Sequence, residues 1–255
     1  MQLPENHFKR ALLAGKPQFG LWAALADAYV TEVLANAGYD WLLIDNEHAP
    51  NDLRTTLAQL QALAPYATHA VVRPPVADRV QIKRLLDIGA QTLLLPMVDT
   101  AEQAAEVVAA TRYPPAGVRG VGSSLARASR WNHVQDYLET ASREICVLVQ
   151  AETTTAIGNL DEIAHVDGVD GVFFGPSDLS ASMGLLGRAG DPEVRDTVVA
   201  GIRTVHAAGK AAGVLTGDRA LARTYLDAGA LFVAVGTDIG VLRTGAKDLR
   251  QAFKP

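Results

Sequence analysis

Runs of Val, Leu, Ile and Phe alternate along this chain with amphipathic segments, most of which end in Gly or Pro. The apolar runs predict strands at 19–25, 40–48, 69–75, 92–98, 146–153, 169–175, 211–217 and 231–236. The amphipathic segments predict helices at 27–38, 52–63, 78–89, 100–114, 155–166, 192–209, 218–229 and after 236. Eight strand-helix units predict that residues 1–255 form one domain of the α/β class, a (β/α)₈ TIM barrel.

A doubly wound sheet is the alternative arrangement of alternating strands and helices. Such a sheet usually has fewer strands and a Gly-rich turn after the first of them. The stretch "WAALADAYV", which spans the end of the first predicted strand and the start of the next helix, contains no glycine. The pattern therefore favours the barrel.

Three segments depart from the strict alternation. Residues 5–15 predict a lead-in helix that closes the bottom of the barrel. Residues 113–137 are rich in Gly, Ser and Arg, and residues 175–192 are polar; both are too long for ordinary connections. We expect the Gly-, Ser- and Arg-rich segment, an insertion at about 115–135, to lie at the top of the barrel and to cover a site there.

Composition excludes several classes of partner. The net charge of −5 is spread along the chain without the Lys and Arg clusters that nucleic acids or anionic membranes attract. No apolar run reaches the roughly 18 residues of a membrane span, and the first residues lack the order of a signal peptide. We expect a cytoplasmic protein without nucleic-acid or membrane partners. Cys146 is the single cysteine and is expected in the core.

The predicted strands end in unusually polar residues. In TIM barrels the chemistry lies at the carboxyl ends of the strands, which makes these residues candidates for a site. The strand before "DNEHAPN" ends in Asp45, Glu47 and His48. The ends of later strands carry Arg73, Gln150, Glu152, Ser177, Asp178, Leu215, Thr216 and Asp218.

The acids Glu152 and Asp178 suggest a hard divalent cation, because Mg²⁺ takes one or two carboxylates and leaves its other positions to water and substrate. Mn²⁺ and Co²⁺ suit the same oxygen ligands. Two acids can also form a glycosidase pair, although aromatic residues make up only 6% of this chain. Zinc is disfavoured because His48 is the one histidine at a strand end. Surface acids paired with loop arginines are the remaining alternative.

Two cationic groups at the strand ends have candidate catalytic roles. His48, flanked by acids, is a candidate general base. Arg73 precedes two prolines that hold the chain extended, which suits a rigid cation presented to an anionic substrate or an oxyanion. The alternative is that Arg73 only pairs with Asp45 or Glu47. No lysine lies at a strand end, which disfavours Schiff-base catalysis, and "GVRGVG" is a weak phosphate motif.

Several long motifs resemble those of the HpcH/HpaI aldolase family, and within it the enzymes that cleave 4-hydroxy-2-oxoheptanedioate. They are "LLIDNEHAPND", "VVRPP", "YPPAGVRGVGSSLARASRWN", "LVQAET", "GVDGVFFGPSDLSASMG" and "LFVAVGTD". The resemblance implies a (β/α)₈ barrel and a class II pyruvate aldolase, a lyase that depends on a divalent metal. It also implies a homohexamer, a trimer of dimers in which neighbours exchange a C-terminal helix.

The same resemblance assigns residues to the metal and the substrate. It implies that Glu152 and Asp178 hold the metal ion and that Gln150, Ser177 and Asp178 bind the pyruvate part of the substrate. Leu215 matches a position on the aldehyde side. Ser177 stands where the family commonly has Ala, and "GVLTGD" differs from close relatives, so the acceptor aldehyde is open.

The resemblance also implies catalytic roles. His48 matches the proton acceptor, and Arg73 matches the group that stabilises the transition state. Asp87 matches an acid that raises the basicity of this histidine, and Asp45 matches an acid in the surroundings of the histidine. Asn46 stands where the family commonly has Gly.

The activity implied is reversible retro-aldol cleavage of 4-hydroxy-2-oxo acids, such as 4-hydroxy-2-oxoheptanedioate, to pyruvate and an aldehyde such as succinate semialdehyde. Its expected setting is aromatic hydrocarbon catabolism. One alternative is a related pyruvate-enolate C–C lyase that acts on a sugar-derived 2-keto-3-deoxy acid or on a coenzyme A thioester. A thioester would need a basic nucleotide groove, for which only Arg119, Arg127 and Arg130 are available. The alternative of another class is a non-catalytic metal-binding barrel.

Overall fold

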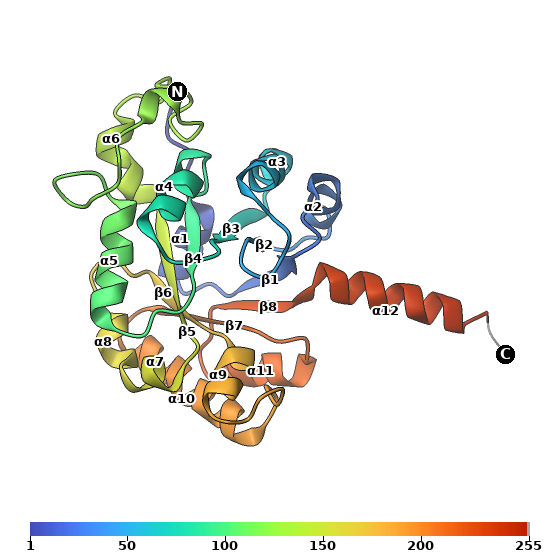
Figure 1. Ribbon diagram of the computed structural model, residues 1–255. Coiled ribbons are helices and arrows are strands. Elements are labelled where there is room, and N and C mark those ends of the chain that lie inside the picture. Colours follow the sequence, from blue (N-terminus) through green and yellow to red (C-terminus); the bar gives the residue numbers. More distant parts are fainter. Residues whose placement is uncertain (254–255) are drawn as a thin grey trace.

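Eight parallel strands close into a barrel in sequence order, as the alternation of apolar and amphipathic segments predicted (Figure 1). The computed structural model describes residues 1–253. The strands are β1 (Gln18–Ala23), β2 (Trp41–Asp45), β3 (His69–Arg73), β4 (Thr92–Leu95), β5 (Cys146–Ala151), β6 (Gly171–Phe174), β7 (Ala211–Leu215) and β8 (Phe232–Thr237). The fold is a (β/α)₈ TIM barrel.

Helices follow the strands and surround the barrel. They are α1 (His7–Leu13), α2 (Ala28–Ala35), α3 (Leu53–Leu63), α4 (Arg79–Asp87), α5 (Ala101–Thr111), α6 (Tyr137–Thr140), α7 (Thr154–Gly158), α8 (Leu160–His165), α9 (Pro176–Ser182), α10 (Pro192–Ala207), α11 (Arg219–Asp227) and α12 (Asp238–Gln251). Two short 3₁₀ helices are η1 (Ser123–Leu125) and η2 (Ala141–Glu144). Aspartates cap many of the amino termini by accepting backbone N–H bonds; they include Asp27, Asp52, Asp78, Asp191 and Asp218.

The interior of the barrel is filled by large side chains from alternate strand positions. They include Trp22, Trp41, Leu43, Val71, Leu94, Leu148, Phe173 and Phe232. Gly20 leaves room for the ring of Trp41, because a Cβ atom there would lie 2.2 Å from the indole. The lead-in helix α1 closes the amino-terminal end, where Phe8 packs edge-on against Trp41 and Phe232. This confirms the predicted role of the lead-in segment.

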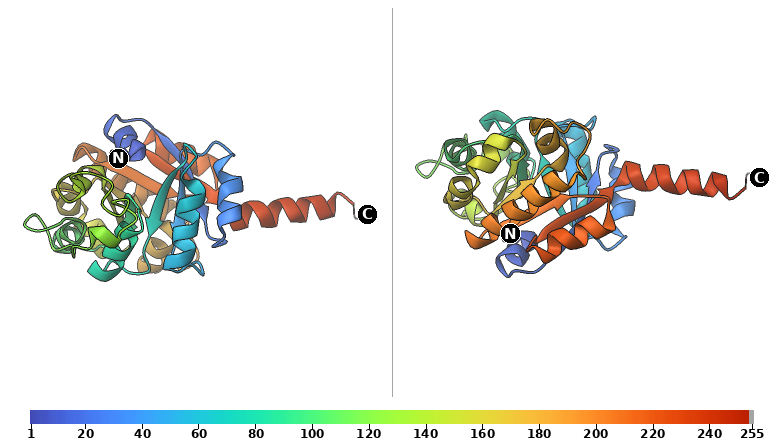
Figure 2. Two further views of the ribbon diagram at one scale, coloured as in Figure 1. Left: turned by 90° about the horizontal axis from the view of Figure 1, so that it is seen from above. Right: turned by 90° about the horizontal axis from the view of Figure 1, so that it is seen from below.

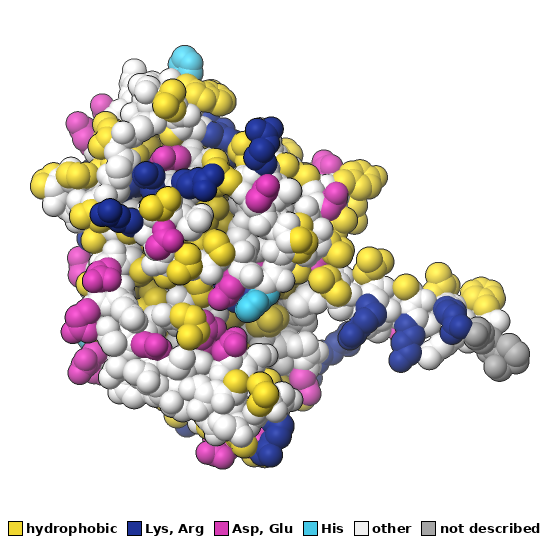
Figure 3. Space-filling view, in the orientation of Figure 1, with side chains coloured by type: hydrophobic (Ala, Val, Ile, Leu, Met, Phe, Trp, Pro, Cys, Tyr) yellow, Lys and Arg dark blue, Asp and Glu magenta, His cyan; other side chains and the backbone are white. Residues whose placement is uncertain are grey.

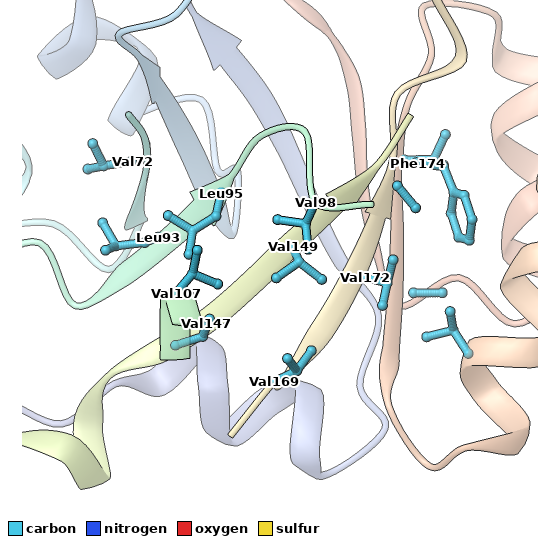
Figure 4. Close-up of a cluster of buried hydrophobic side chains, with 14 of the residues drawn as sticks. Val72, Leu93, Leu95, Val98, Val107, Val147, Val149, Val169, Val172 and Phe174 are labelled. Carbon is cyan, nitrogen blue, oxygen red and sulfur yellow. The ribbon is translucent and has the colours of Figure 1, made fainter. Parts of the chain in front are cut away.

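The outward faces of the strands pack beneath the helices in a second apolar layer (Figure 4). This layer includes Val72, Leu93, Leu95, Val107, Val147, Val149, Val172 and Phe174. Because strand side chains alternate between the two faces, each strand contributes to both layers. Cys146 is buried and free, as expected from its place in an apolar run.

The sequence predicted that the 115–135 insertion lies at the top of the barrel, and this prediction was wrong for the barrel of its own chain. The insertion follows α5 and precedes β5, so it lies at the amino-terminal end of the barrel, as Figure 1 shows for α6 beside the N-terminus. The amino group of Met1 donates to the carbonyl of His133 at 2.8 Å. A connection that follows a helix returns the chain to the start of the next strand, which lies at the amino-terminal end of the barrel. The insertion therefore does not cover the strand ends of its own chain.

Helix α12 projects away from the barrel in all three ribbon views (Figures 1 and 2). Hydrophobic side chains follow one edge of this helix and Lys and Arg the other (Figure 3). Val241, Leu242 and Leu249 are 58–66% exposed. None of the described helices is long and apolar enough to cross a membrane.

Candidate active site

A buried ion pair joins the carboxyl ends of β2 and β3. The strand register places Asp45 opposite Arg73, and both side chains point into the barrel. Arg73 Nε donates to Asp45 Oδ1 at 2.9 Å, and Arg73 Nη2 donates to Asp45 Oδ2 at 2.7 Å. This two-point contact fixes the plane of the guanidinium group. The structure thus brings together two residues that the sequence assigned to the site.

Trp22 on β1 supports this ion pair, and the sequence analysis missed it. Its indole Nε1 donates to Asp45 Oδ2 at 3.2 Å, and the guanidinium of Arg73 stacks over its ring at 5.1 Å. Burial alone would raise the pKa of Asp45, but the hydrogen bonds and positive charge of Arg73 lower it overall. Asp45 is therefore an ionised anchor for Arg73. The available signal was the inward-facing position of a tryptophan near the end of a strand.

Glu47 makes a second contact to Arg73. Its Oε2 lies 2.7 Å from Arg73 Nη1 as an ion pair, without the angles of a hydrogen bond. Burial raises the pKa of Glu47, the charge of Arg73 opposes this, and the charges of Asp45 and Asp178 add to it. Glu47, which the resemblance left without a role, therefore pairs with Arg73 and is close enough to Asp178 for that charge to act on its carboxyl group.

Gln150 and Glu152 share the inward face at the end of β5, as predicted from their spacing. Gln150 Nε2 donates to Glu152 Oε2 at 2.8 Å, and Arg73 Nη1 reaches Gln150 Oε1 at 3.5 Å. The backbone N–H of Met97, a residue in the left-handed region with φ of 54°, donates to Glu152 Oε1 at 2.8 Å. A continuous chain of polar contacts therefore runs from Asp45 through Arg73 and Gln150 to Glu152.

The electrostatics around Glu152 suit a bound cation. Burial raises the pKa of Glu152 to about 7, a backbone hydrogen bond from Met97 opposes this, and the charges of Asp178 and Glu47 add to the rise. Asp178 lies in the first turn of α9 and is exposed, as is Ser177. A positive ion between the carboxylates of Glu152 and Asp178 would relieve this repulsion.

The space beside Glu152 depends on a glycine. A Cβ atom at Gly175 would lie 2.6 Å from Glu152 Oε2 and 3.1 Å from its Cβ. Among the described residues, no group of three or more His, Cys, Asp or Glu side chains could hold a metal ion. Two carboxylates nevertheless fit a hard cation whose other ligands are water and substrate oxygens. Glu152 and Asp178 are therefore the residues that could hold it.

His48 lies at the rim of the site. Its side chain is 67% exposed, its Nε2 is 3.9 Å from Glu47 Oε2, and its backbone N–H approaches Asp45 Oδ1 at 3.4 Å. The side chain can thus reach a ligand that enters from solvent. Leu215 at the end of β7 packs against the interior cluster, on the same inward side as the acids.

Asp87 does not meet His48 in this structure. It is the last residue of α4, at the amino-terminal end of the barrel, and its Oδ1 accepts a hydrogen bond from Arg119 Nη2 at 2.7 Å. Asn46 also lies outside the site, because its Oδ1 accepts from Thr56 on α3 at 2.7 Å. The "GVRGVG" loop and the arginines suggested for a nucleotide groove belong to the insertion at the same end as Asp87. Within one chain they form no groove beside the strand ends.

Comparisons with known proteins identify what this chain is similar to. Residues 18–244 match the family described as HpcH/HpaI aldolase/citrate lyase. The chain is 71% identical over 254 residues to a "Hydroxypyruvate/pyruvate aldolase" of Paraburkholderia phytofirmans, covering all of this chain and 95% of that protein. It is 59% identical over 249 residues to a "4-hydroxy-2-oxo-heptane-1,7-dioate aldolase" of Salmonella paratyphi B, covering 98% and 95%.

A solved structure supports the same assignment. A HpcH/HpaI aldolase/citrate lyase family protein from Burkholderia cenocepacia superposes with a TM-score of 0.93 at 39% identity, covering 98% of this chain and all of that one. The predicted family is therefore confirmed. This chain is a lyase that belongs to the HpcH/HpaI aldolase/citrate lyase family.

Proposed function

We propose that this protein is a divalent-metal-dependent class II aldolase that cleaves 4-hydroxy-2-oxo acids to pyruvate and an aldehyde. The observation that carries the proposal is the acid pair Glu152 and Asp178 beside a rigid, buried Arg73 at the strand ends. In class II cleavage of a keto acid, a cation and an oxyanion-stabilising group share the charge of the enolate, and this site offers carboxylates for the cation together with Arg73. 4-Hydroxy-2-oxoheptanedioate is the first substrate to test, because a relative at 59% identity carries its name.

The proposed roles follow from position and charge. Glu152 and Asp178 would hold Mg²⁺, Mn²⁺ or Co²⁺, which supplies Lewis-acid polarisation of the keto acid when bound. Gln150 and Ser177 line the place of the pyruvate part, and Leu215 offers an apolar surface to the aldehyde part. Arg73, held in plane by Asp45, would stabilise negative charge on the C2 oxygen.

Proton transfer is assigned to His48. In the cleavage direction the imidazole would accept the proton of the C4 hydroxyl, and the C3–C4 bond would break as the aldehyde carbonyl forms. The electron pair of that bond passes to the pyruvate enolate beside Arg73, and a proton added at C3 completes pyruvate. The open rim around His48, with its 67% exposed side chain, suits proton exchange with solvent.

A second donor deserves a test, since the relative at 71% identity is named a hydroxypyruvate/pyruvate aldolase. Hydroxypyruvate differs from pyruvate by a hydroxyl on C3. The residues assigned to the pyruvate enolate would also stabilise the enolate of hydroxypyruvate. Among them Arg73 pairs with two carboxylates, those of Asp45 and Glu47. We therefore propose hydroxypyruvate as a second candidate donor in the synthetic direction.

We expect pyruvate release from 4-hydroxy-2-oxoheptanedioate to stop on chelation and to return on addition of Mg²⁺, Mn²⁺ or Co²⁺. A coupled lactate dehydrogenase assay measures the release, and condensation of pyruvate or hydroxypyruvate with succinate semialdehyde measures the reverse direction. Asp218→Asn is the matched control, because Asp218 lies at a strand end but only caps α11, and Asn caps equally well.

Three results would contradict the proposal in different ways. Cleavage that survives chelation would remove the metal from the mechanism. Turnover of a sugar-derived 2-keto-3-deoxy acid or a coenzyme A thioester alone would replace the substrate class. Metal binding without turnover of any of these substrates would indicate a non-catalytic barrel.

We also propose that copies of this chain assemble into a homohexamer, a trimer of dimers, through exchange of α12. The support is the exposed apolar edge of this projecting helix, together with Tyr29 on α2, which is 76% exposed. Light scattering should give a mass six times that of one chain, and Leu242→Glu should reduce it. A monomeric wild-type protein would contradict the assembly. The cytoplasmic location and the setting in aromatic catabolism stay predictions.

A further inference from the structure

A cavity of about 790 Å³ opens at the end of the barrel opposite the candidate active site. Its walls come from the lead-in segment, the ends of α3 and α4 with the turns after them, and the insertion between α5 and β5. None of the residues assigned to aldol chemistry at the strand ends lines it. The proposed aldolase function therefore leaves this cavity without a role.

Two arginines of the insertion give the cavity a positive wall. Arg127 and Arg130 both line it. Arg127 is partly buried and donates through Nη1 to the carbonyl of Ile88 at 2.9 Å. Burial lowers the pKa of Arg127, and the charge of Arg130 lowers it further, so the two cationic side chains repel each other.

The positive charge is not balanced within the cavity. Among residues 1–253, neither Arg127 nor Arg130 forms an ion pair with an acid. The one acid that lines the cavity, Glu5, contacts Arg10 of α1 instead. Two neighbouring guanidinium groups without an acid, in a chain of net charge −5, are the arrangement that an anion would stabilise.

The backbone holds Arg130 in an unusual conformation. Arg130, Trp131 and Asn132 have φ values of 52°, 54° and 67°, in the left-handed region that non-glycine residues rarely adopt. The buried Ser129 stabilises this turn, since its Oγ donates to Ser123 O and accepts from Asn132 N at 3.1 Å. Such strain persists where the surrounding structure over-determines it, so Arg130 is presented to the cavity from a defined backbone.

The remaining walls are largely apolar. The lining residues with accessible apolar surface include Leu3, Pro4, Ala64, Pro65 and Tyr66, and the buried side chains of Leu60, Leu63, Leu86 and Ile145 also belong to the lining. An apolar enclosure with a few convergent cationic groups is the usual form of a site for a small amphipathic ligand. An inorganic ion alone would leave this surface unused.

We propose that this cavity is a second ligand site, which binds a small organic anion with an apolar body through Arg127 and Arg130. The anionic group, a carboxylate or a phosphate ester, would contact the two guanidinium groups. The apolar body would lie against the accessible apolar lining that includes Leu3, Pro65 and Tyr66. The site is separate from the catalytic face and does not depend on the proposed aldolase activity.

Isothermal titration of the full-length protein tests the proposal, with hexanoate, phenyl phosphate, inorganic phosphate and 1-hexanol as probes. We expect hexanoate or phenyl phosphate to bind, and inorganic phosphate and the neutral 1-hexanol to bind at least about tenfold more weakly, because each lacks one half of the recognition. The tighter binder of hexanoate and phenyl phosphate is the probe used for the variants. Saturating pyruvate with Mg²⁺ should leave the affinity unchanged.

Arg130→Gln should weaken binding of the preferred probe by about tenfold or more, and Arg130→Lys should retain part of it. Within residues 1–253 the guanidinium of Arg130 forms no hydrogen bond or ion pair with another side chain, so the melting temperature and pyruvate release should stay at wild-type values. Arg203→Gln, which removes an exposed arginine from α10, is the control for charge alone. Absence of binding by every probe at millimolar concentration, competition by pyruvate, or equal affinity in Arg130→Gln would each overturn the proposal.

Discussion

Arg73→Ala is expected to lower the kcat of pyruvate release by about 10²–10³, the usual effect of removing one preorganised group that stabilises an oxyanion. The side chain is 7% exposed and is held by Asp45, Glu47 and the ring of Trp22, so no water or flexible side chain can replace it in the same position. Coupled lactate dehydrogenase assays would measure kcat and KM separately. If Arg73→Ala raises KM and leaves kcat unchanged, Arg73 contributes to substrate binding and not to stabilisation of the transition state.

The stability of the variant must be measured beside its rate. Removing Arg73 leaves Asp45 buried without its partner, which typically costs about 3–5 kcal/mol. In the wild type Arg73 lowers the pKa of Asp45, so this pair contributes stability above the ordinary pKa of an aspartate, and the contribution is lost as the pH falls. The melting temperature of Arg73→Ala should therefore fall less on acidification than the melting temperature of the wild type. Wild-type kcat in a folded Arg73→Ala protein would remove this residue from the mechanism.

Glu152→Gln is expected to abolish binding of Mn²⁺ and to lower pyruvate release by at least about 10³, since a Lewis acid contributes several kcal/mol to such a reaction. Gln keeps the size of the side chain and can still accept the N–H of Met97. It removes the buried charge that a cation would neutralise. Titration calorimetry with Mn²⁺ measures the binding without reference to activity.

The thermal stability of this variant gives an independent result. A ligand that binds only the folded state raises the melting temperature, so Mn²⁺ should stabilise the wild type and have no effect on Glu152→Gln. Without metal, the variant should be at least as stable as the wild type above pH 7, because burial raises the pKa of Glu152 to about 7 and ionisation there opposes folding. Asp218→Asn is again the control. Equal Mn²⁺ affinity in Glu152→Gln and wild type would refute the metal site.

The strand ends show how far local pattern could define the site. Alternation of side chains along a strand places Gln150 and Glu152 on one face, and the structure has them on the inward face. From the sequence, Arg73 is either a catalytic cation or only the ion-pair partner of Asp45 or Glu47. The structure has the ion pair with Asp45. Because this ion pair holds Arg73 at the site, it is compatible with a catalytic role for Arg73.

Other features required the packed molecule. Trp22 and Met97 lie in ordinary strand and loop sequence, and they contact the site only because the barrel brings β1 and the end of β4 beside β2 and β5. Asp87 was given a role beside His48 by resemblance, yet it pairs with Arg119 at the other end of the barrel.

The sequence by itself determined the barrel, its eight strands and the identity of most charged groups at their carboxyl ends. It could do so because hydrophobic periodicity and strand-helix order are local properties that the chain carries in its own residues. Tertiary structure alone decided which of these groups touch, that Glu152 is deeply desolvated, and that the insertion lies far from the strand ends. It also decided that two arginines of the insertion line a cavity and pair with no acid among residues 1–253. Distance, burial and charge balance arise between segments far apart in sequence, so they exist only once the barrel has closed.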